Sequence, residues 1–135
     1  MENKITHMEM IQGIINRMGV NSFSLKGWAV TLVAGIFALA SKDTDKMYFL
    51  IAYVPIVVFW FLDAYYLLQE RLYRVLYNKV RAMKEEDIDF NMNTDLPELK
   101  SDQTVYSKCL LSITEMGFYV PLALLVSIII ILTYL

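Results

Sequence analysis

Residues 47–84 constrain the fold more than any other part of the chain, because one helical pattern passes there from apolar to polar sequence. The first part, MYFLIAYVPIVVFWFL, carries no charge from Met47 to Leu62, and Asp63 is the first charged residue that follows. The continuation, DAYYLLQERLYRVLYNKVRAMK, keeps helical spacing but is rich in charge and tyrosine. We therefore expect a membrane helix that continues beyond the lipid as a polar stalk.

Two further blocks are apolar enough to cross a bilayer. Residues 22–41 carry one charge, Lys26, and residues 116–135 carry none. A bilayer-spanning segment needs roughly 17–25 apolar residues, and the absence of water in lipid obliges it to be helical. The expected fold is all-α: an integral membrane protein with transmembrane helices at 22–41, 47–68 and 116–135, preceded by an amphipathic helix at 1–21.

The positive charges orient these helices. The chain has 12 Lys and Arg residues, and two of them, Lys42 and Lys46, lie in the short link 41–46. The other ten lie before or at the start of the first span, or between the second and third spans. The positive-inside rule then places the N-terminus and residues 69–115 in the cytoplasm. We expect a bacterial inner-membrane protein whose C-terminus lies outside.

The N-terminal segment 1–21 shows apolar residues at helical spacing. These are Ile5, Met8, Ile11, Ile15 and Met18. Gly19 is expected to stop this helix, and Asn21 or Ser22 to cap the next one. The helix either lies at the membrane interface or packs on the chain's own stalk.

Residues 69–115 are predicted to form a cytoplasmic helical hairpin with an acidic loop. The stalk helix is expected to reach Lys84, residues 85–100 to form the loop, and Ser101–Glu115 to form a second helix that enters the third span. Pro55 removes one backbone hydrogen bond from the second span and should kink it.

The chain lacks the usual equipment of an enzyme. His7 is the only histidine and is expected at the surface, and neither a Gly-rich phosphate loop nor a Cys/His metal cluster is present. The acidic run at 85–89 does not match a calcium-loop pattern and should be a solvated loop. We predict no catalytic residue, no metal site and no cofactor. A third reading, a membrane enzyme, would bind lipid phosphate with Asp63, Arg71 and Arg74.

Two other classes of interaction are constrained by composition. A net charge of −2 without an extended basic block argues against nucleic-acid binding. The single cysteine, Cys109, excludes an intramolecular disulfide.

Lys26 and Asp63 are the charged residues inside the predicted spans. A charge in a span is expensive and is usually paired or functional. Each lies a few residues from the cytoplasmic end of its span, so their depths match in an antiparallel pair. We predict that they form an intramembrane charge pair. The alternatives are that both reach the headgroup layer, or that they act as gating charges at a pore mouth.

The stalk carries an apolar and aromatic stripe flanked by charges. Its predicted interface residues are Arg71, Tyr73, Arg74 and Tyr77, beside Leu72, Leu76 and Val80. This stripe either packs on residues 101–115 or forms a coiled-coil seam between subunits. In the first span, Gly27, Thr31 and Gly35 recur every four residues, which favours tight helix packing in lipid and, more weakly, homo-oligomers.

Two segments resemble known membrane proteins. SFSLKGWAVTLVAG (residues 22–35) and FWFLDAYYLLQERLYRVLY (residues 59–77) are similar to a group of small, mostly uncharacterised bacterial membrane proteins and to SLATT-type effectors of antiphage defence. The resemblance implies a membrane effector or ion-conducting pore that a cytoplasmic signalling partner or ligand triggers. Three spans cannot enclose a pore alone, so a homo-oligomer in the lipid bilayer is expected. The alternative is a structural or scaffold subunit of a larger membrane complex.

Overall fold

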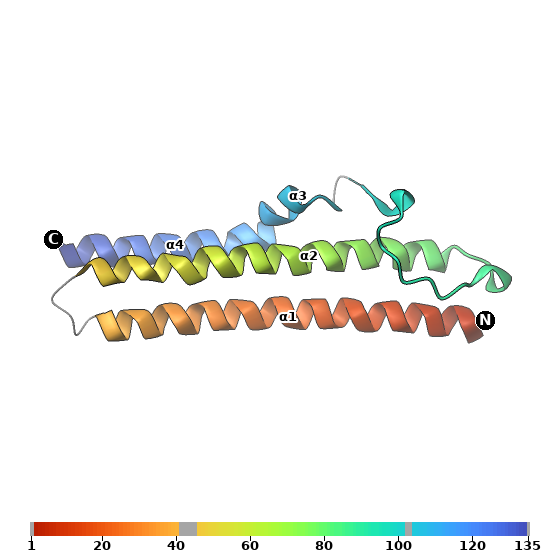
Figure 1. Ribbon diagram of the computed structural model, residues 1–135, viewed down its shortest axis with the longest axis horizontal. Helices are drawn as coiled ribbons and strands as arrows, with labels where there is room; N and C mark the ends of the chain where they lie inside the picture. The colour runs from red at the N-terminus through yellow and green to blue at the C-terminus, as the bar shows by residue number, and fades with distance from the viewer. Residues whose placement is uncertain (1, 41–45, 102–103, 135) are drawn as a thin grey trace.

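The computed structural model describes residues 2–40, 46–101 and 104–134. In these ranges every regular element is a helix and no strand is present, so the predicted all-α class is confirmed (Figure 1). The long helices are α1 (Glu2–Ala40), α2 (Tyr53–Arg81) and α4 (Ile113–Tyr134). The short ones are the 3-10 helices η1 (Lys46–Ala52), η2 (Glu85–Asp87) and η3 (Pro97–Leu99), and the helix α3 (Tyr106–Leu110).

The three long helices form an extended rod. Helices α1 and α2 run antiparallel along each other, while α4 lies along the first half of α2 and runs in the direction of α1 (Figure 1). The rod therefore has two parts. We call residues 22–40, 46–68 and 113–134 the apolar half. We call residues 2–21 and 69–81, with the loop that follows α2, the stalk.

Helix α1 is one continuous helix of 39 residues. The stop predicted at Gly19 is wrong, because the helix passes through this glycine without a break. A glycine inside a helix costs only about 1 kcal/mol relative to alanine, and α1 packs on α2 on both sides of this point. Ser22 caps no helix, and its hydroxyl donates instead to the carboxylate of Asp63.

Helix α2 follows directly on η1, so the second apolar segment changes from 3-10 to α geometry at Tyr53. Pro55 lies in the first turn of α2 rather than in its interior. The first turn of an α-helix tolerates a residue without an N–H, so Pro55 interrupts no hydrogen bond in the helix interior. Where a kink was predicted, the structure has a change from 3-10 to α geometry. The helix ends at Arg81, three residues before the predicted Lys84, with Lys79 and Arg81 in its last turn. The link at 41–45 lies outside the described residues.

In the stalk, α2 packs against α1 and not against a return helix from the segment that follows α2. Ile11 of α1 is fully buried, and Ile15 is 3% exposed. They pack with Leu76 and Val80 of α2 and with Leu99 of the loop. The N-terminal segment was predicted either to lie at the membrane interface or to pack on the stalk, and in the structure it packs on the stalk.

In the residues that the structure describes, Ser101–Glu115 is not the single helix predicted, because α3 covers only Tyr106–Leu110 and α4 begins at Ile113; residues 102–103 lie outside the described ranges. Most of the segment that follows α2 is irregular, and α3 begins only at Tyr106, after an extended Val105. At the start of Ser101–Glu115, the Thr104 hydroxyl accepts a hydrogen bond from the Ser101 N–H at 2.7 Å and donates to the Ser101 carbonyl oxygen at 3.0 Å. Such local bonds compete with helix formation.

His7 is fully buried, against the expectation of a surface residue. Its Nε2 donates to the carbonyl oxygen of Asn91 at 3.0 Å, and its ring lies 5.4 Å from that of Phe90. The carboxylate of Glu85 accepts hydrogen bonds from the first backbone N–H groups of α1, at Asn3 (2.9 Å) and Lys4 (3.1 Å). The loop therefore folds back on the N-terminus of α1.

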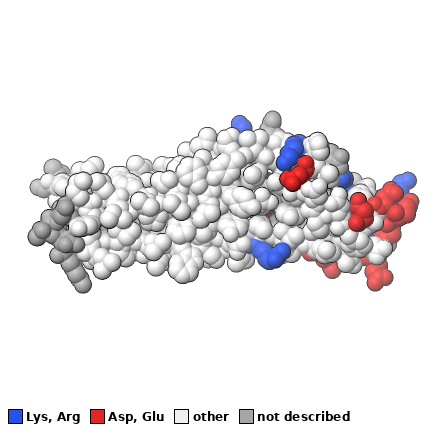
Figure 2. Space-filling model, in the orientation of Figure 1, with Lys and Arg blue, Asp and Glu red and all other residues white. Residues whose placement is uncertain are grey.

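Three helical segments are long and apolar enough to cross a membrane: Glu2–Ala40, Met47–Arg81 and Ile113–Tyr134. Charged side chains gather toward one end of the molecule, whereas the described part of the apolar half shows no charged side chain on the face drawn in Figure 2. Large apolar side chains of the apolar half are exposed, such as Leu125 (53%) and Leu132 (65%) of α4.

Candidate functional site

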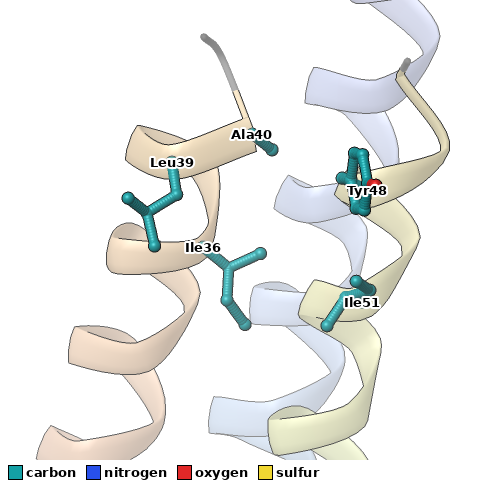
Figure 3. Close-up of a pocket in the computed structure, with 5 residues that line it drawn as sticks. All are labelled: Ile36, Leu39, Ala40, Tyr48 and Ile51. Atoms are coloured by element: carbon teal, nitrogen blue, oxygen red, sulfur yellow. The ribbon is translucent and has the colours of Figure 1, made fainter. Parts of the chain in front are cut away.

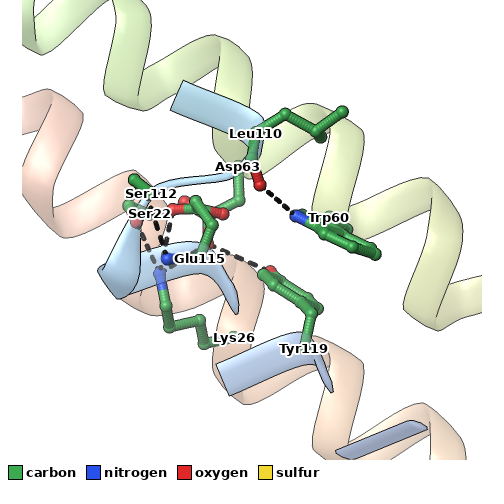
Figure 4. A network of polar contacts seen from close by, with 8 residues as sticks. All are labelled: Ser22, Lys26, Trp60, Asp63, Leu110, Ser112, Glu115 and Tyr119. Carbon is green, nitrogen blue, oxygen red and sulfur yellow. Dashed lines mark hydrogen bonds and ion pairs between the residues drawn. The ribbon is translucent and has the colours of Figure 1, made fainter. Parts of the chain in front are cut away.

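A buried polar cluster lies where the apolar half meets the stalk. Its centre is Asp63 of α2, which is fully buried. The Nζ atom of Lys26 lies 2.5 Å from Asp63 Oδ2, and the Tyr119 hydroxyl donates to the same oxygen at 3.1 Å. The Ser22 hydroxyl donates to Oδ1. Donors from α1 and α4 thus converge on one carboxylate of α2 (Figure 4).

Lys26 joins two carboxyl groups. Besides its contact with Asp63, Nζ lies 2.9 Å from Ser22 Oγ and 3.6 Å from Oε1 of Glu115. It also lies 5.9 Å from the ring centroids of Phe118 and Tyr119, within the range of a cation–π interaction. The side chain is 16% exposed, so the charge is largely removed from solvent. The structure brings together the two residues whose pairing the sequence predicts.

Glu115, on α4, is the member of the cluster that the sequence did not assign. It is fully buried, and neither of its carboxyl oxygens has a hydrogen-bond partner. The depth rule that matched Lys26 with Asp63 applies to Glu115 as well, because it lies just before the cytoplasmic start of the predicted third span. Counting depth from the end of the span therefore gives a signal for Glu115 as well.

Aromatic side chains close the cluster on the side of α3. Trp60 stacks on Tyr119, with ring centroids 6.2 Å apart and planes inclined by 9°, and its Nε1 donates to the carbonyl oxygen of Leu110 at 2.9 Å (Figure 4). The Tyr106 hydroxyl donates to the carbonyl oxygen of Phe61 at 2.8 Å. These bonds fix α3 and the start of α4 against α2.

The predicted stalk interface divides into different environments. Tyr73 and Tyr77 are half-buried against the stalk core. Arg74 is exposed and pairs with Glu70 of its own helix at 2.9 Å. Arg71 points to α3, where its Nη1 donates to Cys109 Sγ at 3.7 Å. Burial raises the pKa of the Cys109 thiol, although the Arg71 guanidinium opposes this rise.

The apolar stripe of the stalk is already covered inside the chain. Leu72, Leu76 and Val80 are all buried, and the last two pack on α1. The predicted packing on 101–115 therefore does not hold for Leu76 and Val80, whereas Arg71 of the same stalk does contact Cys109 in that segment. A coiled-coil seam between subunits is not needed to cover the stripe.

Gly27, Thr31 and Gly35 lie on an exposed face of α1. A Cβ atom added at either glycine would meet nothing within 4 Å, so these residues do not bring α1 close to another helix of this chain. The Thr31 hydroxyl donates to the carbonyl oxygen of Gly27 at 2.8 Å. Packing between copies of the chain stays a prediction.

The cavities of the apolar half offer little chemistry. One of about 200 Å³ lies between α1 and η1 and is lined by apolar side chains and one tyrosine (Figure 3). Its lining residues are Ile36, Leu39, Ala40, Tyr48 and Ile51. Within the described ranges, no group of three or more His, Cys, Asp or Glu residues is placed to hold a metal ion. In the acidic loop, Glu86, Asp87 and Asp89 are exposed.

Comparison with known proteins adds no assignment. No protein-family model matches the sequence, and no match was found among curated proteins or solved structures. The function is therefore argued from the cluster and from its place in the rod.

Proposed function

We propose that the chain is an integral membrane protein of a bacterial inner membrane, with the apolar half in the bilayer and the stalk in the cytoplasm. The exposed apolar side chains and the three helices long enough to span support this placement. The 39 residues of α1 extend about 58 Å at 1.5 Å per residue. Because the hydrocarbon core is about 30 Å thick, nearly half of α1 belongs to the stalk.

The observation that carries the proposal is the position of the buried cluster. Helices α1 and α2 each pass from the stalk into the apolar half without a break, and Lys26 and Asp63 join them at this boundary. Glu115 and Tyr119 join α4 at the same place. A displacement of the stalk would therefore act on the contacts that hold the three membrane helices together.

We infer that the protein is a membrane effector that forms an ion-conducting pore as a homo-oligomer. The interior of a single chain is filled by close-packed side chains, so a path for ions would need several copies. The exposed face of Gly27, Thr31 and Gly35 supports contact between copies, because small residues let helices approach closely in lipid. A cytoplasmic signalling partner or ligand would act on the stalk, and the resemblance to SLATT-type effectors suggests antiphage defence as the setting. The proposal assigns the chain no catalytic activity.

The test is induced expression in bacteria with a dye that reports membrane potential. Wild-type protein is expected to depolarise the cells once triggered, and Gly27→Leu to abolish depolarisation while leaving the amount of membrane-inserted protein unchanged. The matched control is Val30→Leu, because Val30 is exposed on the same helix (45%) and has no small-residue role. Intact potential with wild-type protein under every triggering condition would contradict the pore.

A scaffold subunit of a larger membrane complex is the second candidate. It is favoured by two strongly exposed apolar residues at the boundary, Leu111 (60%) and Ile113 (92%), which a partner protein could cover. Isolation of the native protein as a stable homo-oligomer without other proteins would argue against this role. Co-isolation of a fixed partner, lost in Ile113→Ser, would support it.

A further inference from the structure

The two carboxyl groups of the cluster have unequal surroundings. Asp63 accepts hydrogen bonds from Ser22, Lys26 and Tyr119, so an ionised Asp63 is well stabilised by donors. Glu115 is just as deeply buried, yet both of its oxygens lack a hydrogen-bond donor. Its nearest cation, Lys26 Nζ, lies at 3.6 Å, beyond hydrogen-bond distance, and is already bonded to Asp63.

The charges of the cluster do not balance without a further ligand. One ammonium, Lys26, faces two carboxyl groups, and Tyr119 contributes a neutral hydroxyl. Helix α3 adds the neutral groups Tyr106 and Cys109 nearby. Its charged residue Lys108 is exposed, and Arg71 of α2 donates to Cys109. A buried carboxylate that accepts no hydrogen bond and shares its one cation with a second carboxylate is strongly unfavourable, and such a group takes up a proton instead. One bound proton makes the cluster neutral.

We propose that Glu115 is a proton-binding site inside the helix bundle and that Asp63 is the ionised partner of Lys26. The bound proton lets α4 dock on α1 and α2 without repulsion between the two carboxyl groups. Its release would place two carboxylates against one ammonium and loosen α4. The proton is thus a ligand that controls how firmly the three long helices are held together where the apolar half meets the stalk. The inference rests on the proposed function only in assigning this boundary a role in gating.

The experiment is infrared spectroscopy of the purified protein at neutral pH, in a detergent without carbonyl groups. A protonated carboxylic acid gives a carbonyl band that ionised carboxylates lack. Wild-type protein is expected to show this band, and Glu115→Gln to lose it. Glu86→Gln, which changes an exposed acid, should keep it. A wild-type spectrum without the band, or a band that persists in Glu115→Gln, would overturn the proposal.

Thermal unfolding then decides which carboxyl group holds the proton. Glutamine imitates a protonated glutamic acid, so Glu115→Gln should unfold close to the wild-type temperature, whereas Asp63→Asn should unfold clearly lower. The reverse order would assign the proton to Asp63 and overturn the assignment to Glu115. These readouts need no ion flux, so a failure of the pore proposal leaves them interpretable. If the proton proposal fails, the depolarisation test of the pore can still be interpreted.

Discussion

The Lys26 ammonium and the Asp63 carboxylate lie 2.5 Å apart at the boundary between the apolar half and the stalk. They belong to antiparallel helices that continue on both sides of this contact. The pair therefore fixes the axial register of α1 and α2 at the point where the apolar half meets the stalk.

The first prediction concerns the strength of this pair. Removing one partner of a buried ion pair costs about 3–5 kcal/mol, and we expect Asp63→Asn to lie near the lower end because Lys26 is partly exposed. In a double-mutant cycle with Lys26→Met, the double variant should be more stable than the sum of the single effects by about 1–3 kcal/mol. The free energy of unfolding in mixed detergent micelles measures this. Additive effects would show that the two residues do not interact.

The second prediction concerns the stalk core. Ile11→Ala removes a fully buried side chain and should lower the free energy of unfolding by about 2–5 kcal/mol. Ile5→Ala is the matched control on the same helix, because Ile5 is 48% exposed, and its effect should stay near 0.5 kcal/mol. Hydrogen exchange of the α1 amides before residue 20 reports the same difference locally. Equal effects of the two substitutions would mean that α1 does not pack on α2 as described.

The third prediction uses the acidic loop. Because the Glu85 carboxylate accepts hydrogen bonds from the N–H groups of Asn3 and Lys4, Glu85→Ala should destabilise the first turn of α1, whose N–H groups lose their acceptor. Hydrogen exchange at these amides should become faster. The control is Glu86→Ala, which removes an exposed neighbouring carboxylate. If both variants exchange alike, Glu85 does not cap α1.

The fourth prediction concerns the reactivity of Cys109. Burial raises the pKa of its thiol, so less reactive thiolate is present at neutral pH, and the alkylation rate should increase as the pH rises through the alkaline range. We expect labelling by iodoacetamide to be about tenfold slower or more than that of an exposed cysteine. Ser107→Cys in a Cys109→Ala background provides that reference on the same helix, where Ser107 is exposed. Equal rates at pH 7 in the folded protein would contradict the burial of Cys109.

The sequence predicted much of the apolar half, but it predicted the helix that packs on the stalk only as one of two alternatives. Counting depth from the span ends was enough to match Lys26 with Asp63, and the structure brings them together. The same count extends to Glu115, which lies one residue before the predicted third span. The role of Tyr119 depends on the rotation of α4, which charge counting does not give.

Two features of the fold do not follow from the sequence pattern, each for its own physical reason. Lipid and protein interior are both apolar, so hydropathy does not tell which face of α1 meets α2, and Gly27 and Gly35 lie on the exposed face. In the predicted return arm Ser101–Glu115, the Thr104 hydroxyl bonds both the N–H and the carbonyl oxygen of Ser101, and such local bonds compete with helix formation. The α1 side of the stalk was predicted correctly as one of two alternatives, because its apolar residues have helical spacing.

In the proposed effector, the cluster around Asp63 holds the three long helices together and keeps the pore closed. Ion flux from liposomes that contain equal amounts of inserted protein tests it most directly. Asp63→Asn, which weakens the cluster, should release ions faster than wild-type protein without any trigger. Asp87→Asn, the same substitution at an exposed position, should release ions at the wild-type rate. Equal flux from wild-type protein and Asp63→Asn would contradict the claim.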